Sequence, residues 1–467
     1  MPVGNKLLTF NPITHPKISL LLAATGGAVI NGVYYTLSQD YFLPITGNFY
    51  VPESLVKVNA DFHNNTEKNN LFNTRFDESK LKNLNTSGAE KALKKIKDYT
   101  FKITTPCGSG TAWVLDYAIP TGNAKYPTKW YIATNAHVIS SYRFLSNEYE
   151  QVLPVSLADT QYRRNYYGKF FHWGIFNSSS CELSQRYGFS EMHLYKEASE
   201  EGIVYYKQFK NPKLFYAPIN FLGSRYAEDG RAWRYDNYYK DFAVLEIDID
   251  SEENAKKLTD DFYGKYDPEK EKALNIFDKE LMFKEDSSFG ENYYIAGYPV
   301  KEGKEDLRIS TNWDSSSTRG AHLISGGSKY HSLSIQNKWG EPIAGHIDVR
   351  KIDWNFQNTA TTWNGKPHYD WGYNYLLDNT KMGGGASGSL VSDEQGNILG
   401  LYRMRDVNDK WGFVEPLRSE GMYINSRIVV PKYDLIKGAV GQVSSYKQQL
   451  EKFHPNMETF LSRRGWN

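Results

Sequence analysis

The sequence predicts a mainly β protein, with a β-barrel core that carries large insertions behind an N-terminal transmembrane helix. Two observations lead to this prediction. From Phe101 onward the chain consists of short runs rich in β-branched and aromatic residues, with one helical run before them and one after. Residues 18–39 are mostly apolar and carry no charge, and at about 1.5 Å per residue they just span a bilayer core of about 30 Å.

Composition limits the classes of protein to consider. The 467 residues include 55 basic and 54 acidic side chains, so a net charge of +1 creates no field that favours nucleic acid. An aromatic content of 15% indicates a folded chain rather than a disordered one. The two cysteines, Cys107 and Cys181, are too few for a disulfide framework or a thiolate metal site. They form either a single bridge or two buried thiols.

The apolar stretch 18–39 predicts a single-pass membrane protein. Titratable residues flank it in an asymmetric way, with Lys6, His15 and Lys17 before it and Asp40 and Glu53 after it. By the positive-inside rule, residues 1–17 are cytosolic and the chain beyond the anchor is extracellular at the cell membrane. A cleaved secretory signal and a buried hairpin are the alternatives for this stretch. No cysteine lies near its end, so lipid attachment is not expected.

Changes in composition divide the chain into five segments. They are a cytosolic N-terminus (1–17), an anchor (18–39), a polar Asn-rich stalk (40–88), a β-rich domain with insertions (89–440) and a C-terminal helical tail (441–467). Helices are expected over 89–99 and 446–461, and a charged, helix-favouring block at 250–284 is expected to be a surface insertion. The candidate strands are 101–105, 110–118, 129–139, 241–249, 292–299, 388–393 and 397–404.

Three residues in this framework suit nucleophilic catalysis. His137 ends an apolar run after small residues, where an imidazole can act as a general base. Asp241 opens another apolar run, where a half-buried acid can orient that imidazole. Ser387 lies in a Gly-rich loop whose small residues let a substrate carbonyl approach. The N–H groups of Gly385 and Ser387 can point at one developing oxyanion.

Each residue alone has a simpler explanation, as a core histidine, a turn aspartate or an ordinary loop serine. Their order along the chain is the stronger signal. His, Asp, Ser is the order of the chymotrypsin type, whereas α/β-hydrolases and subtilisins use other orders. The G-x-S-x-G pattern of α/β-hydrolases is also broken here, because Ser389 replaces its last glycine.

The motifs GSGTAWVL, IATNAHVI, DFAVLEID, YYIAGYP and GGASGSLV resemble the trypsin-like serine peptidases of the HtrA and glutamyl-endopeptidase kind. The resemblance implies a chymotrypsin-like double β-barrel with insertions over residues 89–440. It makes His137 the general base, Asp241 its orienting acid and Ser387 the nucleophile. An oxyanion hole from Gly385 and Ser387 is implied as well.

The same resemblance implies a strand that pairs with the substrate backbone, formed by Leu399, Gly400, Leu401 and Tyr402. Beside this strand, the basic residues Lys381, Arg403 and Arg405 either favour an acidic substrate side chain or are simply solvated. No metal and no cofactor are expected, because the other histidines lack the spacing of metal ligands.

More narrowly, the chain resembles the mollicute surface peptidases that include the mycoplasma immunoglobulin proteases. The cues are the anchored N-terminus, the Asn-, Lys- and Tyr-rich composition, the large insertions and the motif GGGASGS. The resemblance implies a surface serine endopeptidase that acts through an acyl-enzyme and cleaves immunoglobulin heavy chain. An immunoglobulin-binding surface protein is the implied partner. Cleavage of other host or self proteins, or an inactive trypsin-fold scaffold, are the alternatives.

Overall fold

The computed structural model describes a large part of the chain downstream of the predicted anchor. The described residues are 56–59, 86–105, 108–157, 191–198, 203–222, 238–267, 273–277, 293–299, 324–326, 329–331, 361–370, 374–378, 382, 384–405, 411–424 and 427–466. The predicted anchor, most of the predicted stalk and both cysteines lie outside these ranges. Among the described helices, none is both long and apolar enough to cross a membrane.

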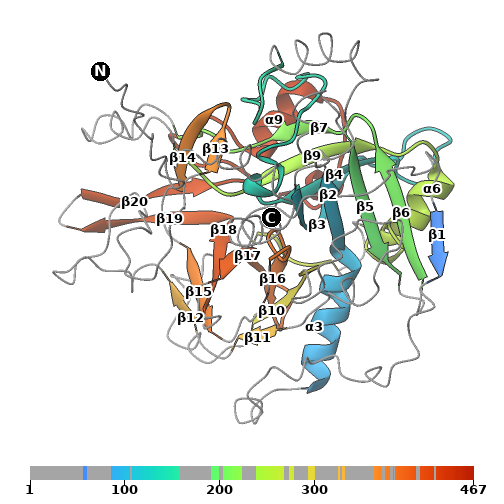
Figure 1. The fold of residues 1–467 in the computed structure, drawn as a ribbon, viewed down its shortest axis with the longest axis horizontal. Coiled ribbons are helices and arrows are strands. Elements are labelled where there is room, and N and C mark those ends of the chain that lie inside the picture. Colours follow the sequence, from blue (N-terminus) through green and yellow to red (C-terminus); the bar gives the residue numbers. More distant parts are fainter. Residues whose placement is uncertain are drawn as a thin grey trace, which may run out of the picture. The chain divides into compact units, whose positions relative to one another are not determined.

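Eight antiparallel strands form the first large sheet (Figure 1). In spatial order they are β1 (Val56–Asn59), β6 (Ile203–Phe209), β5 (Met192–Glu197), β2 (Thr100–Thr105), β3 (Gly108–Tyr117), β4 (Lys129–Thr134), β9 (Ala243–Asp248) and β7 (Lys213–Tyr216). The register of β3 against β4 shifts between Val114 and Asp116, and such an irregularity bends a sheet.

A second sheet has seven antiparallel strands and comes from later in the chain. In spatial order they are β11 (Ile324–Gly326), β10 (Tyr293–Ala296), β16 (Leu390–Asp393), β17 (Ile398–Arg405), β18 (Trp411–Pro416), β15 (Tyr375–Asp378) and β12 (Lys329–His331). Two small sheets complete the described strands. One consists of β13 (Thr361–Trp363), β14 (Lys366–Asp370) and β8 (Tyr238–Tyr239), and the other pairs β19 (Arg418–Ile424) with β20 (Arg427–Asp434).

The mainly β prediction is confirmed by these sheets, which include all seven candidate strands. The strand pairings described here do not show the two closed barrels that were predicted. Among the described strands, the edge strands of each large sheet do not pair with one another, so neither ladder closes.

Most of the described helices are short, and all of them lie beside the sheets (Figure 1). They are α3 (Thr86–Tyr99), the 3-10 helix η2 (Ala136–Ile139), α6 (Glu252–Leu258), α7 (Phe262–Lys265), α9 (Tyr446–Phe453) and α10 (Phe460–Arg463). The helix predicted at 89–99 is α3, which begins three residues earlier. The helical prediction for the charged insertion is confirmed over α6 and α7.

The single helix predicted over 446–461 is wrong, because α9 and α10 are separated. Pro455 explains the break, since it lacks an N–H and disfavours helical backbone in the residue before it. His454 has a φ of −134° and a ψ of 55°, outside the helical region.

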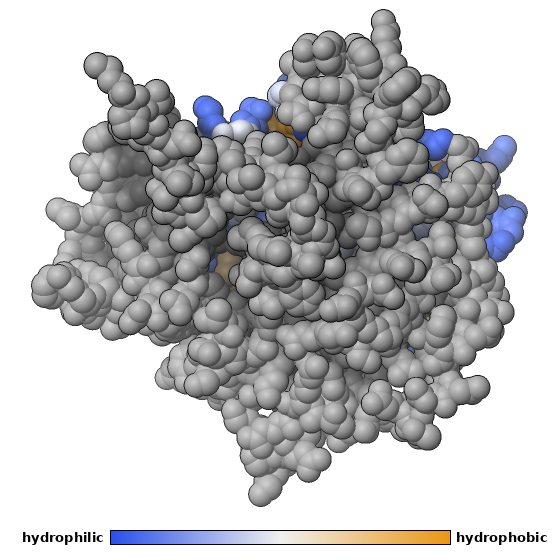
Figure 2. Space-filling model, in the orientation of Figure 1, coloured by the Kyte–Doolittle hydropathy of each residue, from blue (hydrophilic) through white to orange (hydrophobic). Residues whose placement is uncertain are grey.

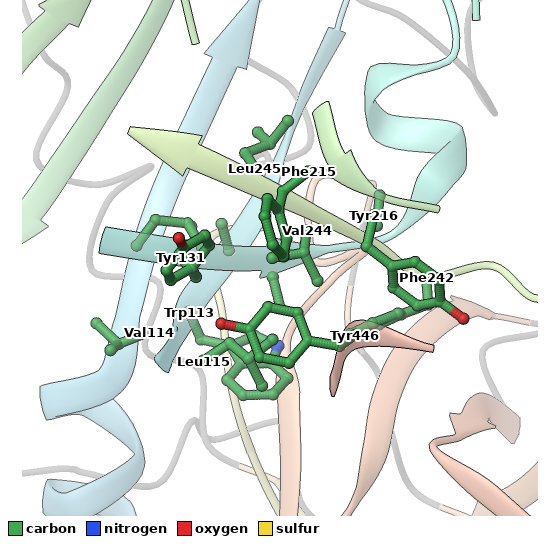
Figure 3. Close-up of a cluster of buried hydrophobic side chains, with 14 of the residues drawn as sticks. Trp113, Val114, Leu115, Tyr131, Phe215, Tyr216, Phe242, Val244, Leu245 and Tyr446 are labelled. Atoms are coloured by element: carbon green, nitrogen blue, oxygen red, sulfur yellow. The ribbon is translucent and has the colours of Figure 1, made fainter. Parts of the chain in front are cut away.

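The C-terminal segment is part of the core rather than an appendage. Figure 3 shows Tyr446 of α9 among side chains from β3, β4, β7 and β9. Its ring centroid lies 5.6 Å from that of Tyr131 and 5.5 Å from that of Phe215. Such aromatic contacts add about 0.5–1.5 kcal/mol each beyond area burial. The coloured surface in Figure 2 is mainly hydrophilic, and few large apolar side chains of the described residues are exposed.

A buried aspartate fastens this segment to β3. One carboxylate oxygen of Asp116 accepts the backbone N–H groups of Tyr117 (2.9 Å) and Leu461 (3.0 Å), and the other accepts the hydroxyl of Tyr446 (2.9 Å). Burial raises the pKa of Asp116 to about 7, although the hydrogen bonds that it accepts oppose this change. The folded protein therefore takes up a proton at Asp116 at a pH where the unfolded chain does not.

We predict that Asp116 makes the free energy of unfolding fall as the pH rises. Its raised pKa contributes stability that is complete below the unfolded pKa of about 4 and is lost as the pH rises through about 7. Asp116→Asn removes this titration. The free energy of unfolding of the wild type minus that of the variant should therefore decrease as the pH rises from about 4 to about 7. Urea unfolding across this range measures it, with the exposed Asp248→Asn as control. A constant difference would contradict the assignment.

Candidate active site

His137 lies in a short 3-10 turn that follows the end of β4 in the first sheet. The strand predicted over 129–139 ends at Thr134, and Asn135 is extended before η2 begins. The other three residues of η2 are buried, while the side chain of His137 is 18% exposed. The histidine therefore lies beyond the strand rather than at its last position. The three apolar residues of η2 are buried, which leaves His137 as the partly exposed residue of the turn.

Asp241 lies two residues before β9 and is fully buried. One carboxylate oxygen, Oδ2, lies 2.6 Å from His137 Nδ1, and the other accepts the backbone N–H of His137 at 2.9 Å. The side-chain amide of Asn135 donates to the backbone carbonyl of Asp241 at 2.6 Å. With Nδ1 directed at a carboxylate, the imidazole keeps Nε2 for a second partner.

The ionised state of Asp241 is supported by its neighbours. Burial alone would raise the pKa of this carboxyl. The nearby His137 with its hydrogen bonds, together with the Arg403 guanidinium, outweighs burial and holds the pKa of Asp241 below its usual value. The aspartate can therefore remain charged although its side chain is fully buried.

Ser387 lies in the loop between β15 and β16, and β3 of the first sheet holds that loop. The N–H of Thr111 donates to the carbonyl of Ser387 at 2.8 Å, and its hydroxyl donates to the carbonyl of Gly385 at 3.1 Å. The same hydroxyl accepts the N–H of Tyr298 at 2.8 Å. One threonine thus joins the serine loop to β3, which pairs with β4, the strand that leads to His137.

The hydroxyl of Ser387 donates to the backbone carbonyl of Arg403 at 3.0 Å. Among the described residues, no hydrogen bond connects this hydroxyl with His137. The neighbouring Ser389 is fully buried and donates to the carbonyl of Ala386 at 2.5 Å. The structure therefore gives the partly exposed position to Ser387 and a packing position to Ser389.

The predicted oxyanion-hole residues surround a sharp bend of this loop. Gly385 has a φ of +89° and Gly388 a φ of +92°, values that favour glycine. Within the described part of the chain, the N–H groups of Gly385 and Ser387 donate to no acceptor. Both donors are thus available to an external oxygen.

The residues predicted to pair with a substrate are enclosed by the second sheet. Gly400 and Leu401 of β17 pair with β16 on one side and with β18 on the other, and the carbonyl of Tyr402 accepts from Gly388 at 2.8 Å. The segment Gly400–Tyr402 therefore has no free edge there for a further strand, and Leu399 lies at a register shift between β16 and β17. The backbone carbonyl that faces the site is that of the next residue, Arg403.

Arg403 is a site residue that sequence reasoning assigned differently. Of the three basic residues expected near a substrate or in solvent, it is the one whose side chain the structure describes, and it is only 2% exposed. Its Nε lies 3.1 Å from Asp241 Oδ2, and its Nη2 donates to the hydroxyl of Tyr239 at 3.3 Å. The sequence did contain a sign of this burial. Arg403 lies inside the apolar run ILGLYRM, and an arginine in a buried strand requires a partner.

Two further buried charges lie behind the aspartate. Glu415 forms an ion pair with Lys240, and both side chains are fully buried. Glu415 also accepts the N–H of Asp241 at 3.3 Å and lies 3.9 Å from Arg403. Two anions and two cations therefore pack together next to His137. Among the described residues, no group of three His, Cys, Asp or Glu side chains is arranged to hold a metal.

A protein-family model described as "Mycoplasma immunoglobulin protease" matches residues 62–404, which is most of the chain and includes His137, Asp241, Ser387 and Arg403. The chain belongs to this family. The resemblance drawn from the sequence motifs is thereby confirmed at the level of the family.

Relatives of this family member include lipoproteins of mollicutes. An uncharacterized lipoprotein of Mycoplasma capricolum is 23% identical over 484 aligned residues, covering 80% of this chain and 70% of the relative. An uncharacterized lipoprotein of Mycoplasma genitalium is 22% identical and covers 74% of each chain. A membrane-associated lipoprotein of Ureaplasma parvum is 23% identical, with 74% of this chain and 49% of the relative aligned.

Solved structures with a similar trace include one described as mycoplasma MIB and MIP proteins. The TM-score is 0.45 at 16% identity, over 77% of this chain and 60% of that one. A structure of Glu endopeptidase gives a TM-score of 0.27 at 14% identity, over 68% of this chain and 85% of that one.

We predict that Gly388→Ala disrupts the serine loop. A methyl group there would lie 2.0 Å from the carbonyl oxygen of Thr111, on a backbone with a φ of +92°. The variant should lose at least about 2 kcal/mol of unfolding free energy, measured by urea denaturation. Gly384→Ala is the matched control, because its methyl group would meet no atom within 4 Å, and it should stay within about 0.5 kcal/mol. Equal losses in the two variants would contradict the described loop.

Proposed function

We propose that this family member is a surface serine endopeptidase that uses Ser387, His137 and Asp241 within a chymotrypsin-like double barrel. The observation that carries the proposal is the two-point contact between the buried Asp241 and His137, beside a serine loop fixed by Thr111. Membership of a protease family supports the reaction class. The arrangement also contains the base, the acid that orients it and two free backbone donors.

In the proposed acyl transfer each group has one role. Ser387 Oγ leaves the carbonyl of Arg403, turns to His137 Nε2 and attacks the peptide carbonyl as its proton passes to the imidazole. The N–H groups of Gly385 and Ser387 then stabilise the oxyanion. His137 delivers the proton to the leaving amine, the C–N bond breaks, and an acyl-enzyme forms on Ser387. Water, deprotonated by the same imidazole, releases the acid.

We further propose that the substrate is an immunoglobulin heavy chain presented by an immunoglobulin-binding surface protein. The description of the family model supports this substrate class. The lipoprotein relatives support a membrane-associated location on the cell surface. In this chain we assign the attachment to residues 18–39, with the peptidase outside the cell.

An inactive scaffold with the same fold is the second candidate. The observation in its favour is the hydrogen bond that holds Ser387 Oγ on the carbonyl of Arg403 rather than on His137. An enzyme requires Ser387 Oγ to leave this carbonyl and to reach His137 Nε2. Covalent labelling separates the two candidates.

We predict that a fluorophosphonate probe labels Ser387. The serine oxygen displaces fluoride from phosphorus, so the protein gains the mass of the phosphonyl group on the peptide that contains Ser387. Ser387→Ala should abolish labelling. Ser389→Ala should keep it within about tenfold, because it loses one buried hydrogen bond but no reacting atom. Folded wild-type protein that takes no label would favour the scaffold.

We predict that the full-length protein cleaves IgG heavy chain when an immunoglobulin-binding surface protein is present. The readout is the appearance of heavy-chain fragments by mass spectrometry, with Ser387→Ala as the matched control. Intact heavy chain together with positive fluorophosphonate labelling would remove the substrate assignment and leave the serine peptidase standing. Fragments that persist with Ser387→Ala would indicate a contaminating protease.

A further inference from the structure

Arg403 is connected to both ends of the proposed catalytic machinery. Its carbonyl accepts the hydroxyl of Ser387, and its guanidinium contacts the carboxylate of Asp241. This guanidinium approaches Oδ2, the same oxygen that lies 2.6 Å from His137 Nδ1. A permanent positive charge and the imidazole therefore share one carboxylate oxygen.

The charge of Arg403 has a definite effect on the imidazole. An aspartate next to a histidine stabilises the imidazolium, which favours proton uptake. A guanidinium at the same oxygen opposes that uptake, because two positive charges then share one anion. Arginine stays charged at every pH in the working range, so its effect does not titrate away.

We propose that Arg403 is a positioning residue that holds Asp241 beneath His137 and opposes protonation of the imidazole, so that the base stays free at lower pH. The inference rests on the proposed serine peptidase function and adds a residue that sets its pH range. Arg403 acts through Asp241 and does not itself exchange a proton.

The groups around His137 agree with this role. On the approach to β9 the facing group is the carboxylate of Asp241, and on β17 it is the guanidinium of Arg403. Behind them lie Glu415 on β18, Lys240 beside Asp241, and the hydroxyl of Tyr239, which accepts from Arg403. Lys240 pairs with Glu415, whereas Arg403 contacts the carboxylate oxygen that lies beside His137 Nδ1.

Glu415 provides a change of opposite sign within the same cluster. Its carboxylate lies 3.9 Å from the guanidinium of Arg403 and partly offsets that charge. Removing this negative charge should strengthen the effect of Arg403 on the imidazole. Arg403→Gln and Glu415→Gln should therefore move the protonation of His137 in opposite directions. A purely structural role for Arg403 predicts no such opposition.

The test follows the imidazole of His137 directly by NMR, in full-length protein with carbon-labelled histidine and the Ser387→Ala change. His137→Gln assigns the signal, and no catalytic activity is needed. Arg403→Gln should raise the pH of half-protonation of His137 by about one unit, whereas Glu415→Gln should lower it. Arg403→Lys keeps the charge and should stay near the reference. Equal midpoints in all four proteins would overturn the inference.

The rate of fluorophosphonate labelling provides the second readout, in proteins that keep the native Ser387. The acid limb of the fluorophosphonate labelling rate should move to higher pH in Arg403→Gln and to lower pH in Glu415→Gln. If Arg403→Gln does not fold, Glu415→Gln alone is used for the test. An unchanged or raised pH of half-protonation of His137 in that variant contradicts the inference. Absence of labelling in the wild type would count against the proposed peptidase only, because the NMR shifts do not depend on it.

Discussion

The arrangement of the site depends on one buried charge, the carboxylate of Asp241. A charged group that loses its water must find partners in the protein, or it takes up a proton. Here the partners come from both large sheets, with His137 following β4 and Arg403 on β17. Satisfying this one carboxylate therefore brings together segments that are far apart in the sequence.

A second set of contacts places the nucleophile relative to that carboxylate. Thr111 on β3 bonds through its backbone and its hydroxyl to the loop that contains Ser387. Gly388 allows the approach, because any side chain there would collide with the carbonyl of Thr111. The geometry of the site is thus determined by backbone contacts between the sheets, and the reactive side chains extend from a fixed frame.

Local patterns predicted the strands and the first helix, and they singled out His137, Asp241 and Ser387 as candidate site residues. Alternation, Gly-rich loops and residue order are visible in the sequence. The break at Pro455 was also visible and was missed. The partners of β17 and the burial of Arg403 depend on contacts between segments distant in sequence. Local patterns do not contain that information, so Arg403 was expected near the substrate or in solvent although it contacts Asp241.

We propose that Ser387, His137 and the two loop N–H groups form one reactive centre. A crystal structure of the protein treated with diisopropyl fluorophosphate would test this proposal. We expect a phosphoryl group on Ser387 Oγ, with its oxygen in hydrogen-bond contact with the N–H groups of Gly385 and Ser387. An unmodified Ser387 that still donates to the carbonyl of Arg403, or modification of another residue, would contradict it.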